Sequence, residues 1–224
     1  MPYSARLKQL LTPPERRAFQ KLSTPQKIQD FLDDLPINFE LLGETYMSPR
    51  RVLRERTAHC FEGALFAAAA LAYHGKKPLL LDLKSIDADQ DHVVAPFKEA
   101  GRWGAISKTN HAILRYRDPI YLSVRELAMS FVNEYIMDDG RKSMRSYSAP
   151  FSLSRYPPDE WITREEDLVP IVDALDDSKH FPIAPEKAMR RMRRALPFEV
   201  DKLAWQEEWL PGRKPRRAKL LDRR

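Results

Sequence analysis

The chain has one cysteine, few glycines and no long apolar run. The single cysteine, Cys60, excludes an intrachain disulfide, so nothing in the sequence points to an oxidising compartment. Seven glycines among 224 residues leave no glycine-rich loop of the kind that binds phosphates. The longest apolar run, residues 64–73, is too short to cross a bilayer. The segment 1–11 has no apolar centre of signal-peptide length. We therefore expect a cytoplasmic protein without a transmembrane segment.

The composition is that of a soluble globular protein, with 43% hydrophobic and 31% charged residues. A chain of this length suits one domain with appendages and can bury a substantial core. We expect four parts: a helical N-terminal arm (1–36), an α+β core (37–155), a helical C-terminal extension (156–210) and a basic tail (211–224).

The net charge of +6 is a property of the tail. Residues 211–224 (PGRKPRRAKLLDRR) hold seven of the 38 Lys and Arg and one of the 32 Asp and Glu, so the other 210 residues balance at 31 of each. A short basic segment with proline and glycine is typical of disorder. It predicts weak contact with nucleic acid or an anionic surface through phosphates, or merely a solubilising terminus.

Cys60 lies where a loop-rich segment, 36–59, meets an alanine-rich apolar segment that ends at Gly75. A thiol in the first turn of a helix feels the positive end of the helix dipole, which lowers its pKa toward the reactive thiolate. His92 follows at the start of a predicted strand. Cysteine and histidine in this arrangement are the minimal nucleophile and base of a thiol enzyme, although a lone cysteine can equally be a small buried hydrophobe.

Local patterns predict the elements around this pair. The pair Thr24-Pro25 predicts a helix over 25–34. The patterns further predict a buried strand over 78–83, a hairpin of strands 92–97 and 103–107, short extended pieces over 141–160, and amphipathic helices over 185–196 and 199–209. Capping-box spacings predict a helix from Ser123 to near Gly140 and another from Thr163 through Leu175.

The run from Ala58 to Phe66 (AHCFEGALF), followed by 71–79 (LAYHGKKPL), resembles the catalytic helix of the transglutaminase-like superfamily. The match to that family continues in a histidine, His92, that begins one strand and a tryptophan, Trp103, on the next. The resemblance covers roughly residues 25–120. It implies a transglutaminase-like or papain-like α+β fold, in which a catalytic helix packs on an antiparallel sheet.

The sequence departs from the family pattern at Ser107, the position where the family places an aspartate. An aspartate there would orient the histidine and stabilise its charged form, whereas serine supplies a hydrogen bond without charge. An amide can also orient a catalytic histidine. In order of preference, the candidates for the orienting residue are Asn110, Ser107 and Asp118.

Two other groups of polar residues contain possible metal ligands, but neither has the spacing of a known metal site. Asp87, Asp89 and Asp91 alternate as in a calcium loop, but His92 and Lys98 occupy the positions of its glycine and bidentate glutamate. The histidines and Cys60 lack zinc-ligand spacing. We therefore expect no metal and no cofactor.

The favoured interpretation is a transglutaminase-like thiol enzyme in which Cys60 forms a thioester with an amide or peptide substrate and His92 is the general base and acid. Whether it is a hydrolase or a transferase is left open, with hydrolysis preferred. The alternatives are a non-catalytic module that keeps the fold and binds a partner, and a nucleic-acid-associated protein that acts through residues 211–224.

Overall fold

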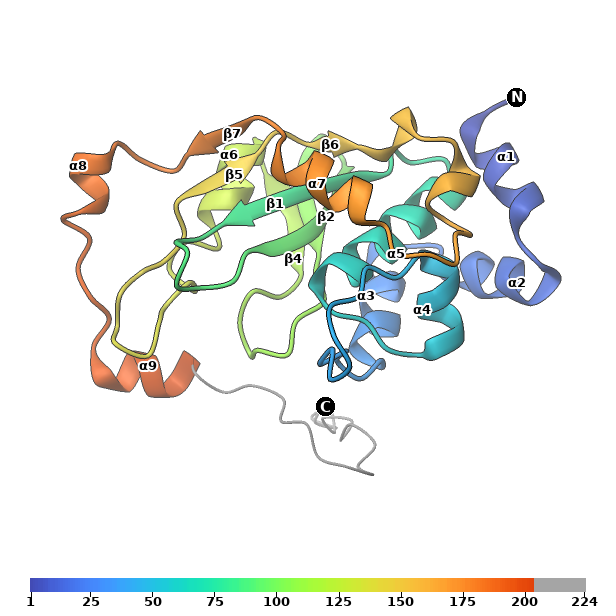
Figure 1. Ribbon diagram of the computed structural model, residues 1–224. Coiled ribbons are helices and arrows are strands. Elements are labelled where there is room, and N and C mark those ends of the chain that lie inside the picture. The colour runs from blue at the N-terminus through green and yellow to red at the C-terminus, as the bar shows by residue number, and fades with distance from the viewer. Residues whose placement is uncertain (204–224) are drawn as a thin grey trace, which may run out of the picture.

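The computed structural model describes residues 1–203. It combines helices with one antiparallel sheet (Figure 1), which confirms the predicted α+β class. The helices are α1 (Tyr3–Leu10), α2 (Pro13–Lys21), α3 (Pro25–Asp33), α4 (Pro49–Glu55), α5 (Cys60–Tyr73), α6 (Val124–Met129), α7 (Val169–Asp176), α8 (Glu186–Met189) and α9 (Pro197–Leu203). The strands are β1 (Leu79–Lys84), β2 (His92–Glu99), β3 (Arg102–Ile106), β4 (Arg117–Tyr121), β5 (Ser146–Ser148), β6 (Phe151–Ser152) and β7 (His180–Pro182). Short 3₁₀ helices cover Leu153–Arg155 and Pro158–Glu160.

The central element is α5, which begins at Cys60 as the sequence predicts. Alanine is the best helix former and its small side chain lets neighbours approach closely. At the other end Gly75 takes a left-handed backbone with φ of +82°. The N–H groups of Gly75 and Lys76 donate to the carbonyls of Ala72 and Leu71, which is the Schellman ending of a helix.

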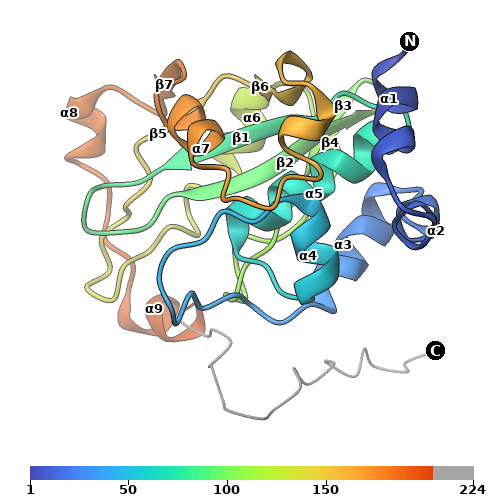
Figure 2. The same cartoon turned by 45° about the vertical axis from the view of Figure 1, so that its right-hand side comes forward.

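All residues of α5 from Phe61 to Tyr73 are buried. A helix that is apolar on all sides needs neighbours on all sides, and α5 has them. It packs on β2 and is flanked by α1, α3 and α4; Figures 1 and 2 both show the N-terminal helices gathered around it. The N-terminal arm therefore helps to cover the helix that carries the cysteine.

The sheet order is β4-β3-β2-β1-β5-β7, and β6 pairs with β1. The predicted hairpin is confirmed as β2 and β3, with Ala95 opposite Ile106. On its other edge β2 pairs with β1, so that His92 lies opposite Leu83. The first residue of β2 is thereby held against β1, beyond the last pair that β2 forms with β3.

Two apolar clusters cover the sheet. One contains the side chains of α5 together with Val93, Ala95 and α7 residues. The other lies around Leu81, Val94 and the segment 124–135. Neither cluster could be assigned from a single element, because each collects residues from distant parts of the sequence.

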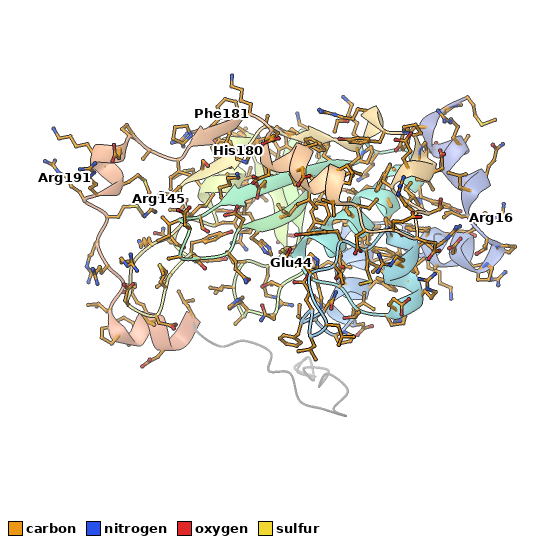
Figure 3. The ribbon with its side chains drawn as sticks, viewed as in Figure 1. Arg16, Glu44, Arg145, His180, Phe181 and Arg191 are labelled. Carbon is orange, nitrogen blue, oxygen red and sulfur yellow. The ribbon has the colours of Figure 1, made fainter. Side chains whose placement is uncertain are left out.

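The region expected to be a helical C-terminal extension also contains a strand. β7, which carries His180 and Phe181 (Figure 3), pairs with β5 and lengthens the sheet. The same region meets the N-terminus, where the indole of Trp161 donates to the hydroxyl of Tyr3 at 2.7 Å. Among residues 1–203, no helix combines the length and the apolar character that a bilayer crossing requires.

The helix predicted over 25–34 is confirmed as α3, and the Thr24 hydroxyl accepts from the Lys27 N–H. The expectation of a loop over 36–59 missed α4. Its start repeats the signal seen at α3, because Ser48 precedes Pro49 and accepts from the Arg51 N–H.

Two predicted helices differ from the structure in length or start. The helix predicted from Ser123 to Gly140 ends at Met129, because the Ser130 hydroxyl donates to the Leu127 carbonyl and the chain turns so that Phe131 can enter the core. The capping box at Thr163 does not form, since that hydroxyl donates back to the Asp159 carbonyl. The helix starts at Val169 instead. Two residues before it, the Asp167 carboxylate accepts hydrogen bonds from the Tyr46 N–H and from Arg51.

The two amphipathic candidates near the end are shorter than predicted or only partly described. The first, 185–196, is helical only over α8. The second is represented by α9, and the remainder of 199–209 and the tail 211–224 lie outside the described residues.

A Gly63→Ala substitution tests how closely α5 is packed. Helix propensity alone predicts that alanine stabilises a helix interior by about 1 kcal/mol. A Cβ at Gly63, however, would lie 2.4 Å from the Cβ of buried Lys108, so we expect the free energy of unfolding to fall by about 1–3 kcal/mol. Urea unfolding of both proteins measures it, and an increase in stability would contradict this packing.

Candidate active site

Cys60 is the first residue of α5 and directly follows His59, the N-cap residue. The unpaired N–H groups and the dipole at the start of this 14-residue helix favour a negative charge. The cysteine is half-buried. A reactant can therefore reach the thiol, while the surrounding groups still determine its pKa.

Glu62 fixes the loop 38–47 against the start of α5. Its side chain is completely buried. It accepts hydrogen bonds from the His59 N–H at 3.0 Å, the Met47 N–H at 3.0 Å, the Thr45 hydroxyl at 2.8 Å and the Asn38 amide at 3.2 Å. All four partners are donors, so the carboxylate ties the start of α5 to the loop 38–47, which contains Glu44 (Figure 3).

The imidazole of His59 lies between this loop and the thiol. Its Nε2 is 2.8 Å from the carbonyl oxygen of Thr45. Because a carbonyl only accepts, Nε2 carries a hydrogen and donates it, which leaves Nδ1 available toward Cys60, whose pKa the ring lowers. The side chain of His59 is only 16% exposed.

His92 approaches the same thiol from the sheet and is buried. Its Nε2 is 2.8 Å from the Ser107 hydroxyl, and that hydroxyl donates to the carbonyl of Leu114. Ser107 must therefore accept from His92, so Nε2 carries the hydrogen and Nδ1 is the basic nitrogen. Hydrogen bonding and charge from the His92 ring lower the pKa of the Cys60 thiol, and the tautomer leaves Nδ1 with a lone pair.

Gln29 of α3 holds the serine in place. Its amide donates to the Ser107 carbonyl at 2.8 Å and accepts from the Ser107 N–H at 2.9 Å, and the Gln29 side chain is buried. The amide thus pairs with the backbone of Ser107 as a neighbouring strand would. Sequence reasoning missed this residue because the two positions are 78 apart and no local pattern connects them.

The electrostatic environment favours the thiolate. Burial alone raises the pKa of a thiol, but hydrogen bonds from His59 and His92 and the charges of both rings outweigh it and hold the pKa of Cys60 well below its ordinary value. The reverse holds for His59: burial opposes its charge, whereas Cys60, Glu62 and the Thr45 carbonyl raise its pKa to about 9.

The structure brings Cys60, His92 and Ser107 together and leaves the other candidates aside. Among the described residues, the partner of His92 Nε2 is Ser107, our second choice, rather than Asn110, which is half-buried in the segment after β3. Asp118 is exposed on β4. His111 lies within electrostatic reach of the site, because burial and the charge of His92 lower its pKa.

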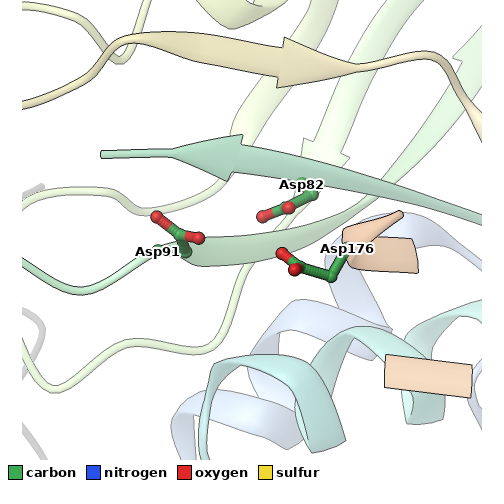
Figure 4. A group of neighbouring side chains, drawn as sticks. All are labelled: Asp82, Asp91 and Asp176. Atoms are coloured by element: carbon green, nitrogen blue, oxygen red, sulfur yellow. The ribbon is translucent and has the colours of Figure 1, made fainter. Parts of the chain in front are cut away.

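One group of carboxylates has the spacing of a metal site. Oxygen atoms of Asp82, Asp91 and Asp176 lie within 4.8 Å of one another, and the carboxyl groups face each other in Figure 4. Lys84 pairs with Asp176, and His180 Nε2 is 3.1 Å from Asp82. Because two of the three carboxylates already have a basic side chain beside them, we assign the cluster no metal.

The chain matches no protein-family model and no curated protein sequence.

Proposed function

We propose that the chain is a transglutaminase-like thiol enzyme that cleaves or transfers the acyl group of an amide or peptide through a thioester on Cys60. The observation that carries the proposal is the 2.8 Å hydrogen bond by which Ser107 holds Nε2 of His92, beside a Cys60 thiol whose pKa that ring lowers. A nucleophile with a base in contact, and a third group that orients the base, is the arrangement that thiol catalysis requires.

The reaction follows from the positions of these groups. His92 accepts the thiol proton through Nδ1, and the Cys60 sulfur attacks the carbonyl carbon. The backbone N–H of Cys60, at the helix start, is the natural donor to the oxyanion. His92 then gives its proton to the amine, which leaves, and the thioester remains. Water activated by His92 releases the acid and restores the thiol.

The orienting group in this proposal is uncharged. A Ser107→Ala variant loses the hydrogen bond that fixes the His92 ring, which is worth about 1–3 kcal/mol, or roughly 5- to 150-fold in the rate of thioester hydrolysis. We expect a loss in that range with an unchanged fold, measured with an acyl ester such as p-nitrophenyl acetate. The Asn110→Ala variant is the matched control, because Asn110 is not the described partner of His92. Equal losses in both variants would contradict this role for Ser107.

Alkylation of Cys60 by iodoacetamide as a function of pH tests the proposal. The chain has one cysteine, so the rate reports a single thiol. We expect an inflection well below the ordinary thiol value of about 8.5. An unreactive thiol, or an inflection at the ordinary value, would contradict catalysis.

An unreactive thiol would instead favour a non-catalytic binding module, for which the serine at the family's aspartate position is the supporting observation. The third candidate, nucleic-acid contact through residues 211–224, predicts salt-sensitive binding that deletion of the tail removes and Cys60→Ala leaves unchanged.

A further inference from the structure

We propose that His59 is a second catalytic imidazole, which stays charged and holds Cys60 as a thiolate while His92 performs the proton transfers. This inference rests on the proposed function, because it concerns the same sulfur. Its starting point is the distribution of charge around the thiol. His92 has a neutral serine where the transglutaminase-like pattern has a carboxylate, whereas the buried carboxylate of Glu62 lies beside His59 on the other side.

The surroundings of the His59 ring suit a cation. Nε2 donates to the Thr45 carbonyl at 2.8 Å, and the carboxylate oxygens of Glu62 and Glu40 lie 3.5 and 3.8 Å from the same nitrogen. A second proton on Nδ1 would point toward the sulfur of Cys60. Both nitrogens of an imidazolium would then have acceptors, which are a carbonyl with two carboxylates on one side and a thiolate on the other.

The charged groups that face His59 come from each element around it. Cys60 and Glu62 belong to α5, Glu40 to the loop 38–47, and Asp167 to the segment before α7. The Asp167 carboxylate is shared with Arg51, and beyond the thiol lies His92. Two imidazolium ions would thus be balanced by the thiolate and the buried Glu62 carboxylate, so the site could hold the thiolate without an unpaired buried charge.

The pH range of this charge follows from the direction of the shifts. The pKa of His59 is raised to about 9, so its proton is lost only as the pH rises through that value. The pKa of Cys60 is lowered, so the thiolate persists as the pH falls. Between the two values both charges are present.

The test compares asparagine variants by the pH profile of iodoacetamide alkylation. Asparagine is a favourable N-cap residue, so His59→Asn keeps the helix start while it removes the cation. We expect its inflection to move up by about one to three pH units. His92→Asn should move it less, because His59 still holds the thiolate. His111→Asn is the matched control, with no expected change. A His59→Asn profile that coincides with that of the unmodified protein would overturn the inference.

A spectroscopic measurement on the unmodified chain keeps the inference testable if a variant fails to fold. The ¹⁵N chemical shifts of the His59 ring at neutral pH should show both nitrogens protonated. A neutral ring would overturn the inference, yet it would leave the proposed function standing if Cys60 still forms a thioester. An unreactive thiol beside a charged His59 would contradict the proposed function instead.

Discussion

Replacing His92 with alanine should slow hydrolysis of a Cys60 thioester by about 10²–10⁴-fold, the range typical of a lost general base. The basic Nδ1 of His92 activates the attacking water in the proposed mechanism, and its hydrogen-bonded Nε2 keeps that tautomer. Steady-state release of p-nitrophenol from p-nitrophenyl acetate measures the effect, because turnover then depends on deacylation. The rate of the first acylation should fall less, since the leaving group needs no acid.

The His111→Ala variant is the matched control for this experiment. His111 lies near enough to His92 for the charge of that ring to lower its pKa, but the groups that lower the pKa of the Cys60 thiol are His59 and His92. We expect turnover within a few-fold of the unmodified protein. If His92→Ala and His111→Ala turn over equally fast, His92 is not the base.

Replacing Glu62 with leucine should destabilise the protein by about 3–5 kcal/mol, the cost typical of breaking a buried, fully hydrogen-bonded charge from its partners. Four donors would lose their acceptor, among them the N–H groups of His59 and Met47. Each buried donor without a partner costs about 1–3 kcal/mol. Urea unfolding measures the change, and alkylation should slow as well because the loop that holds His59 is released.

The control for this prediction is Glu55→Leu, which removes an exposed carboxylate at the end of α4. Its ion pair with Arg54 is on the surface, where such pairs contribute about 0–1 kcal/mol. If Glu62→Leu costs no more than this control, Glu62 does not hold the loop.

The parts of the fold with strong local signals could be predicted from the sequence. The alanine-rich helix from Cys60 and the hairpin that begins at His92 have periodicity, length and turn residues that favour one structure. The end of the helix after Ser123 could not be predicted in this way. A serine hydroxyl that turns back to a carbonyl, and an aromatic residue that enters a distant core, are decided by tertiary packing.

The candidate site likewise has residues that the sequence predicts and residues that it does not. The positions of Cys60 and His92 follow from helix position and strand order. Gln29 holds Ser107, and Glu62 holds the loop 38–47. Both contacts join residues that are far apart in the sequence, so no local pattern predicts them. The sequence favours Asn110 as the orienting residue, because an amide can replace the aspartate of a catalytic triad. The serine is favoured by geometry, since the strand pairing of β2 and β3 brings Ser107 beside His92.

The most direct test of the central claim is intact-mass analysis of the full chain during reaction with p-nitrophenyl acetate. We predict one acetyl group on Cys60 that appears and then disappears in the unmodified protein, persists in His92→Ala, and is absent in Cys60→Ala. A chain that gains no acetyl group, or whose adduct on Cys60 is hydrolysed equally fast with and without His92, would contradict the account of Cys60 and His92 as a catalytic pair.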